Sequence, residues 1–358
     1  TYYYTGGGKF IARGKTASGM DALVFNCTTQ LWANAGQIDI DGRSTTGAGH
    51  AMQLQRNAST SQSEFFSSSD MAPAIKFTAI SNGRYGFLSG YNVDTQHVVL
   101  IQATGTGGVQ IEGLGGAGDW FDIGLSGTDI LTRGDIRLIN NGTGSAGGFS
   151  SGKLAWNIVG TNSVLGYCPL ITCANSRVTT SAANVYITTD RVASSDTDIK
   201  LTVNTSGTFK VEPNSSSGFN EFESRAQGLA ISEGCTSVTI GKYQSTDTYV
   251  LDVYANIKIN GPIRFYGGRV GIYGNLESTR AGSEIRAKSN GSVYVYLSKT
   301  VKTNGGDVVF WSNADKVQGT TAVAGTIWLE NSSSVTTRGG KIWLGGGLDD
   351  GGADASIT

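Results

Sequence analysis

Proline, histidine and charged residues are all scarce in this chain of 358 residues. It has only 4 prolines and 2 histidines, and 15% of its residues are charged, against a typical share of about 25%. The 27 Lys and Arg residues nearly balance the 28 Asp and Glu residues, for a formal net charge of −1. No basic run is present that would follow a phosphate backbone. We therefore expect no nucleic-acid partner.

Long apolar runs and helical periodicity are also missing. No run of about 18 apolar residues predicts a membrane-spanning helix. No window of about 12 residues keeps apolar side chains on one helical face. The nearest approach, at residues 220–226, predicts one or two helical turns. The chain starts at Thr1 and shows no basic-plus-apolar signal segment, so we expect a processed piece of a longer protein.

Glycine and β-prone residues take the place of these missing features. Glycine contributes 52 residues, 39% of the chain is hydrophobic, and Tyr, Phe and Trp number 14, 13 and 6. Aromatic and β-branched side chains suit a pleated, half-buried surface. Short alternating runs follow a glycine repeatedly, as at 134–139, 261–267, 306–311 and 340–345. This pattern predicts strands separated by corners at which glycine supplies a positive φ.

A repeat near the end of the sequence indicates how the strands stack. Residues 301–308 match residues 335–342 at an offset of 34 (335 − 301), and the strand after Gly325 falls between them. We therefore expect a repeat of two coils of unequal length. Such units stack and share one core. With coils of about 20 residues the chain would form roughly 18 rungs, about 85 Å long at ~4.8 Å per rung.

An antiparallel sandwich is the alternative fold. Asn82-Gly83, Asn141-Gly142 and Asn290-Gly291 each have the composition of a hairpin turn. The number of strands is too high for one sandwich, and a parallel β-helix accommodates them better. We predict an all-β parallel β-helix (β-solenoid), with coils over 105–358 that are most regular from 255. Residues 1–104 are expected to form a less regular β region that starts with a capping or assembly strand.

The segments 305–312 (GGDVVFWS) and 339–347 (GGKIWLGGG) resemble the strand repeats of filamentous haemagglutinin-like bacterial adhesins. The resemblance is clearest over 255–350 and looser over 105–210. It implies a right-handed β-helix and a secreted or surface-attached rod that serves adhesion or fibre formation. We therefore expect an extracellular structural or adhesive protein that is not an enzyme. Its expected partners are further copies of itself, joined end to end or by strand addition at residues 1–5, and surface glycans.

Candidate catalytic residues are few. Gly14-Lys15-Thr16 lacks the upstream glycine of a phosphate loop. Neither His50 nor His97 has a recognisable nucleophile beside it. Because β-helices also house polysaccharide lyases and tailspikes, carboxylates on neighbouring coils keep a glycan-cleaving alternative open. The pairs that would serve it are Asp39 with Asp41, Asp119 with Asp122, and Asp349 with Asp350.

Two other kinds of site remain open. Asp349, Asp350 and Asp354 form an acidic cluster whose hard oxygen ligands suit calcium; no other cofactor is expected. Cys168 and Cys173 could close a small disulfide loop in an oxidising compartment, or serve as small apolar core residues.

Three tryptophans recur in the strands of the last third, at Trp311, Trp328 and Trp343. The favoured interpretation is a stack inside the core. The alternative is an outward ladder that stacks on sugar rings. Strand alternation places Trp343 on the same face as Lys341, which favours an outward position for that residue.

Overall fold

The structure is a computed structural model. It describes residues 2–25, 29–45, 49–54, 63–89, 99–116, 122–125, 128–140, 149–151, 156–160, 183–189, 191–193, 201–214, 221–224, 229–242, 250–314 and 325–347. Within these ranges the chain is built of strands and turns, with no helix. Residues 220–226, where helical turns were expected, contain the strand β21 (Glu221–Ser224) instead.

The strands form three long faces of one rod. Sheet A comprises β1 (Tyr2–Tyr4), β4 (Gln30–Trp32), β7 (Ser63–Ser67), β10 (Val99–Ala103), β13 (Thr128–Thr132), β16 (Trp156–Gly160), β19 (Leu201–Asn204) and β22 (Leu229–Ile231). Sheet B comprises β2 (Phe10–Thr16), β5 (Ile38–Ser44), β8 (Ile75–Ser81), β11 (Val109–Leu114), β14 (Ile136–Asn140), β17 (Val185–Thr188), β20 (Thr208–Glu212), β23 (Ser237–Ile240), β26 (Ile263–Gly267), β29 (Ile285–Ser289), β32 (Val308–Ser312) and β35 (Ile342–Gly346).

Sheet C comprises β3 (Leu23–Phe25), β6 (Met52–Leu54), β9 (Phe87–Ser89), β12 (Ile123–Leu125), β15 (Phe149–Ser151), β18 (Arg191–Ala193), β21, β24 (Val250–Val253), β27 (Arg269–Ile272), β30 (Val293–Val295) and β33 (Ile327–Leu329). A fourth sheet, D, takes the place of sheet A in the later coils: sheet A ends at β22, and sheet D begins three strands later. It comprises β25 (Ile257–Ile259), β28 (Leu276–Ala281), β31 (Thr300–Asn304) and β34 (Ser334–Thr336).

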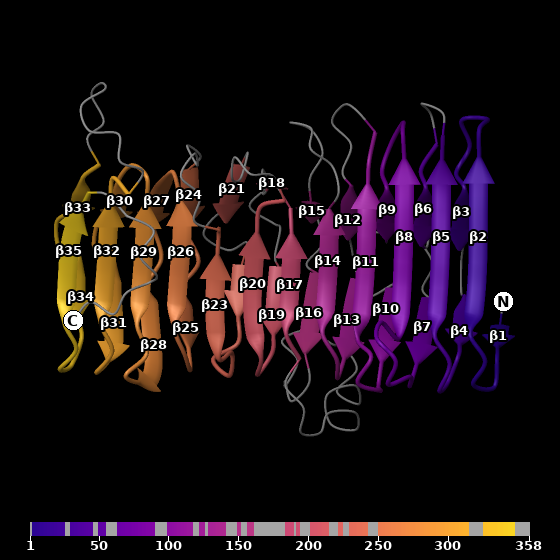
Figure 1. The fold of residues 1–358 in the computed structure, drawn as a ribbon, viewed down its shortest axis with the longest axis horizontal. Coiled ribbons are helices and arrows are strands. Elements are labelled where there is room, and N and C mark those ends of the chain that lie inside the picture. Colours follow the sequence, from indigo (N-terminus) through magenta and orange to yellow (C-terminus); the bar gives the residue numbers. More distant parts are fainter. Residues whose placement is uncertain are drawn as a thin grey trace.

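Each strand pairs in parallel with the third strand before and after it, so one coil contributes one strand to each face. Figure 1 shows the result: sheet B runs the length of the rod, from β2 at one end to β35 at the other. The prediction of a parallel β-helix is confirmed. The antiparallel alternative is wrong: Asn82-Gly83 lies at the corner between β8 and β9, which belong to different sheets.

The coils are longer and fewer than the sequence suggested. Equivalent positions in sheet B are 22 residues apart between Ile263 and Ile285 (285 − 263) and 49 apart between Ile136 and Val185 (185 − 136). Sheet B therefore has 12 strands and spans about 50 Å at ~4.8 Å per step. The 34-residue repeat is one coil of three strands, because Val301 pairs with Val335 and the strand after Gly325 is β33 of sheet C.

Strand alternation sends one side chain inward and the next outward. In β7, Phe65 is fully buried while its neighbour Phe66 lies on the outer face beside Trp32, with ring centroids 6.1 Å apart. Inside, the Phe65 ring meets Phe25 at 5.5 Å and Phe77 at 5.4 Å. One apolar core continues from Leu31 to Phe310 through contacts of this kind.

Glycine closes the corner that leads into sheet B. In many coils the residue two positions before the first inward side chain of the sheet B strand is glycine. These glycines are Gly8, Gly36, Gly107, Gly134, Gly207, Gly261, Gly306 and Gly340. A Cβ at Gly261 would lie 1.8 Å from the Thr236 carbonyl oxygen of the preceding coil, and one at Gly306 would lie 2.0 Å from that of Ser283. Close approach of two backbones thus accounts for glycine at these two corners, whereas other coils carry Pro73, Ala183, Thr236 and Ser283 at the same position.

Buried hydroxyl groups satisfy the backbone at the same corner. Ser278 donates to the Gly261 carbonyl oxygen at 2.8 Å, and Thr337 donates to that of Gly340 at 2.6 Å. A buried carbonyl group without a hydrogen bond costs free energy. These hydroxyls stabilise the corners because they donate to carbonyl oxygens of the turn, outside the hydrogen-bond ladders of the strands. The Ser- and Thr-rich composition therefore serves the interior as well as the surface.

Candidate functional site

Several residues singled out from the sequence lie outside the described ranges. These are Asp119, His97, Cys168, Cys173, Asp349, Asp350 and Asp354. The disulfide and the calcium cluster therefore stay predictions. Within the described ranges, no group of three or more His, Cys, Asp or Glu side chains is placed to hold a metal ion.

Asp39 and Asp41 lie on the outer face of β5, as their two-residue spacing predicts. Asp39 Oδ2 is 3.0 Å from Lys9 Nζ and 2.9 Å from Arg13 Nη2, and Asp41 Oδ1 is 3.0 Å from Arg43 Nε. Partial burial alone would raise the pKa of Asp39, but hydrogen bonds and charge from Arg13 and Lys9 outweigh it and lower that pKa. Both carboxylates thus form ion pairs with cations on the outer strand face.

Asp122 and His50 are interior groups of the fold. Asp122 is fully buried, and its carboxylate accepts a hydrogen bond from the Gly115 N–H. The backbone N–H of His50 donates to Asp21 Oδ1 at 2.9 Å, and its ring stacks on Tyr85 with centroids 5.1 Å apart. The His50 ring thus packs against an aromatic side chain.

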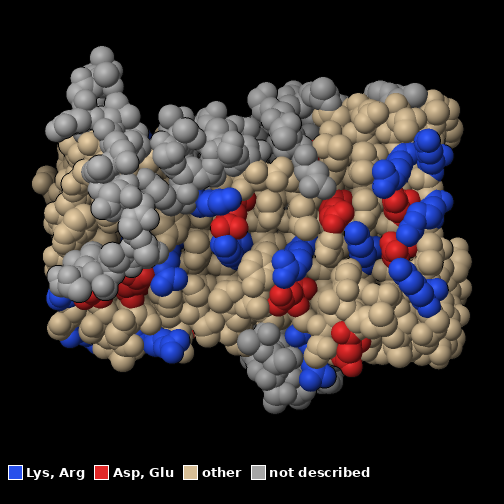
Figure 2. Space-filling model, viewed as in Figure 1, with Lys and Arg blue, Asp and Glu red and all other residues tan. Residues whose placement is uncertain are grey.

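The outer face of sheet B carries neighbouring opposite charges. Figure 2 shows this face, on which Lys and Arg side chains alternate with Asp and Glu side chains along the rod. One group joins two neighbouring strands, β26 and β29: Glu284, just before β29, accepts from Arg264 Nε at 2.7 Å and from Arg286 Nη2 at 2.9 Å. Strand pairing places Arg264 opposite Arg286, and the Glu284 carboxylate bridges these two like charges.

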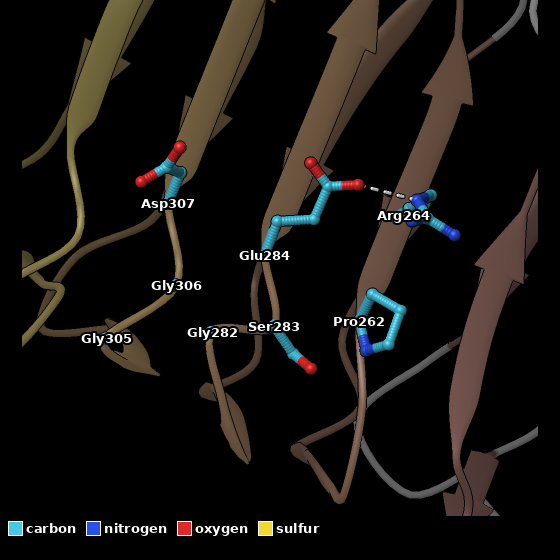
Figure 3. Close-up of a pocket in the computed structure, with 8 residues that line it drawn as sticks. All are labelled: Pro262, Arg264, Gly282, Ser283, Glu284, Gly305, Gly306 and Asp307. Carbon is cyan, nitrogen blue, oxygen red and sulfur yellow. Dashed lines mark hydrogen bonds and ion pairs between the residues drawn. The ribbon is translucent and has the colours of Figure 1, made fainter. Parts of the chain in front are cut away.

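A shallow polar groove of about 370 Å³ lies at the corner where sheet B begins. Figure 3 shows that Pro262, Glu284 and Asp307 line it from three neighbouring coils, while Gly282, Gly305 and Gly306 add no side chains. The two carboxylates of the groove are already engaged: Glu284 binds two guanidinium groups, and Asp307 Oδ1 accepts from the Lys341 N–H at 2.7 Å.

We expect Glu284→Gln to lower the free energy of unfolding by about 1–2 kcal/mol, because it leaves two partly buried guanidinium groups facing each other. The matched control is Glu277→Gln, which removes a more exposed pair with Lys302 at 3.1 Å and should cost no more than about 0.5 kcal/mol. Chemical denaturation of both variants measures the difference. Equal losses would contradict a structural role for the Glu284 cluster.

The three tryptophans do not form the expected inner stack. Trp311 and Trp343 lie on the outer face of sheet B in neighbouring strands, with ring centroids 5.2 Å apart, and Lys288 Nζ lies 4.6 Å from the Trp311 centroid. Trp328 belongs to sheet C and is 59% exposed. Phe310 and Val308 fill the interior instead, because alternation gives the inward positions of β32 to them.

Within the described residues, a connected set of five aromatic rings lies along the outer face of sheet C. We call Tyr254, Tyr273, Tyr294, Tyr296 and Trp328 the aromatic patch. Tyr254 stacks on Tyr273 at 4.4 Å with an interplanar angle of 14°, and Tyr273 lies 5.1 Å from Tyr296. Tyr294 meets Trp328 edge to face at 5.7 Å. Sequence reasoning missed the tyrosines, since they come from three successive coils of different lengths.

Two carboxylates border the aromatic patch. Asp252 forms an ion pair with Arg269 at 3.0 Å. Burial raises the pKa of the Tyr273 hydroxyl, and the Asp252 charge adds to the effect. At the other end, Glu330 accepts hydrogen bonds from the Tyr294 hydroxyl and, at 2.8 Å, from the Leu297 N–H. The hydrogen bond to Glu330 raises the pKa of Tyr294 to about 12.

We expect Tyr294 to resist alkaline titration. Its pKa is raised above the ordinary 10.0, so its protonated form stabilises the fold below pH 10, and this contribution disappears as the pH rises towards 12. Glu330→Gln should return the titration to the ordinary range. Tyrosinate absorbance, read as the difference from a Tyr294→Phe control, measures this shift. An unchanged titration in the Gln variant would contradict the assignment to Glu330.

Cys235 is a buried thiol at the corner between β22 and β23. Its sulfur lies 3.2 Å from the Ser237 carbonyl oxygen and 3.4 Å from that of Gly207, and burial raises its pKa. It therefore behaves as a small core side chain rather than a reactive thiolate. No helix in the described part of the chain is long and apolar enough to cross a membrane.

In comparisons with known proteins, no family model, curated protein or solved structure matches the chain.

Proposed function

We propose that this chain is a structural and adhesive segment of a secreted bacterial surface protein and belongs to an extracellular fibre. The observation that carries the proposal is the 12-stranded parallel sheet B, which stacks on one continuous core. Each coil contacts its neighbours, so stability accumulates along the rod and length can grow without a new fold. A low charge content and the adhesin-like strand repeats support an extracellular position.

Self-association is the partner interaction that suits such a rod. Strand β1 is the first strand of sheet A and pairs on one side with β4. Tyr2 and Tyr4 are strongly exposed in this strand. A strand from a second copy could therefore extend the sheet at this edge by main-chain hydrogen bonds.

Electron microscopy and sedimentation velocity of the purified chain test the proposal. We expect rods about 50 Å long that join end to end as concentration rises, and less joining after removal of residues 1–5. Discrete particles whose sedimentation is independent of concentration would contradict fibre formation. Unchanged joining in the truncated chain would contradict the role of the first strand alone.

Glycan cleavage is the second candidate, because the groove of Figure 3 brings Glu284 and Asp307 together from neighbouring coils. A glycosidase needs one carboxyl group that donates a proton and one that acts as base or nucleophile. Both oxygens of Glu284 already accept from arginine, which favours the structural interpretation. Loss of viscosity in a polysaccharide solution, abolished by Asp307→Asn, would reverse this preference.

A further inference from the structure

The side chains of the aromatic patch form two parallel columns on sheet C. Strand pairing aligns Asp252, Gly271, Tyr294 and Trp328 in the first column. The second column lies two residues further along each strand. It consists of Tyr254, Tyr273, Tyr296 and Glu330. Four successive coils thus build a grid of five aromatic rings with a carboxylate at each of two diagonal corners.

Gly271 makes this grid continuous. A Cβ at Gly271 would lie 2.5 Å from Tyr273 Cε2 and 2.4 Å from Asp252 Oδ1. The glycine therefore leaves the space into which the Tyr273 ring folds. Tyr273 in turn contacts rings of the preceding and following coils, Tyr254 and Tyr296. The rings form a connected surface along the rod axis rather than isolated side chains.

The outer end of this surface is open to solvent. Trp328 is 59% exposed and Tyr296 is 40% exposed, and the apolar side chain of Leu297, next to Tyr296, is exposed as well. Exposed apolar surface bordered by polar groups marks interaction sites. Here the polar groups are the Glu330 carboxylate and the tyrosine hydroxyls.

The dimensions of the patch indicate what can bind. Two columns lie about 7 Å apart and three rung steps cover about 14 Å, so the surface is on the order of 200 Å². A stable protein–protein interface needs about 800 Å² from each partner. A narrow polymer that lies along the columns fits this strip better, and repeated weak contacts along a fibre would add up through multivalency.

We propose that the aromatic patch binds a neutral polysaccharide chain that lies along the rod axis. The apolar C–H faces of the sugar rings pack on the Trp328 and Tyr296 rings. Sugar hydroxyls donate to the Glu330 and Asp252 carboxylates, since an ionised carboxylate offers about four acceptor lone pairs. This site deepens the adhesive part of the proposed function and rests on it, because it supplies the surface through which the rod would adhere.

Affinity electrophoresis of the intact chain through gels that contain hydroxyethyl cellulose, galactomannan or alginate tests the site. We expect retardation by at least one of the two neutral polymers and not by anionic alginate, since the border of the patch carries carboxylates. Trp328→Ala and Tyr296→Ala should each weaken binding by about tenfold, a loss typical of one aromatic contact. Trp32→Ala on sheet A, which is 40% exposed, is the matched control and should bind as the original chain does.

Three outcomes would overturn the proposal: no retardation by either neutral polymer, retardation that persists in both patch variants, or an equal loss in the Trp32 control. Thermal unfolding of each variant shows whether it still folds, and Trp328→Phe keeps an aromatic face if alanine destabilises the coil. Failure of the binding site is distinguishable from failure of the fibre proposal. Rods that join end to end in electron micrographs but are not retarded by the polymers would refute polysaccharide binding at the aromatic patch alone.

Discussion

Replacing Phe65 with alanine is expected to lower the free energy of unfolding by about 4 kcal/mol, the usual cost of removing a buried phenylalanine ring. Phe65 is fully buried and its ring contacts both Phe25 and Phe77. These contacts join rings from sheets A, B and C across the core. The ladders on three sides restrict collapse of the surrounding side chains into the cavity, so little of this cost is recovered by relaxation.

The matched control is the neighbouring residue. Phe66 lies on the outer face of the same strand, beside Trp32, so Phe66→Ala should cost about 1 kcal/mol through the lost aromatic contact and partial burial. Urea denaturation followed by circular dichroism compares the two variants. Equal losses would mean that strand β7 does not have the alternation described here.

A second large effect is expected at the corner before sheet B. Gly261→Ala should lower the free energy of unfolding by about 3 kcal/mol, because the added methyl group meets backbone rather than a movable side chain. Its Cβ would lie 1.8 Å from the Thr236 carbonyl oxygen. The two coils must separate to admit it, and neighbouring ladder hydrogen bonds lengthen as they do.

Gly234→Ala is the control for this variant. Gly234 lies in an exposed turn, where the nearest atom to an added Cβ is the Thr205 carbonyl oxygen at 3.9 Å. Alanine there restricts the unfolded chain without a clash, so stability should stay the same or rise by about 0.5 kcal/mol. Thermal melts of both proteins measure the contrast. A tolerated Gly261→Ala would show that the coils are not stacked as closely as described.

The sequence alone determined the class of the fold. Runs of alternating apolar and polar residues after glycine predicted strands and corners. The absence of helical periodicity argued against helices and so favoured an all-β fold. The match of residues 301–308 with 335–342 marked equivalent positions of neighbouring coils, but the prediction that this unit holds two coils was wrong, because its 34 residues form one coil. Local pattern determines these features because alternation and a backbone that cannot accept a Cβ are properties of a few adjacent residues.

Only the tertiary structure decided the number of strands per coil and the contents of the outer face. Corner loops between stacked strands change length at little entropic cost, so Tyr254, Tyr273, Tyr296 and Glu330 lie 19, 23 and 34 residues apart (273 − 254, 296 − 273, 330 − 296). No fixed period in the sequence reveals that they form one column. The inward or outward position of Trp311 likewise depends on where β32 enters the ladder, which is set by its pairing with β29 and β35. The aromatic patch exists because four coils of unequal length return to the same register.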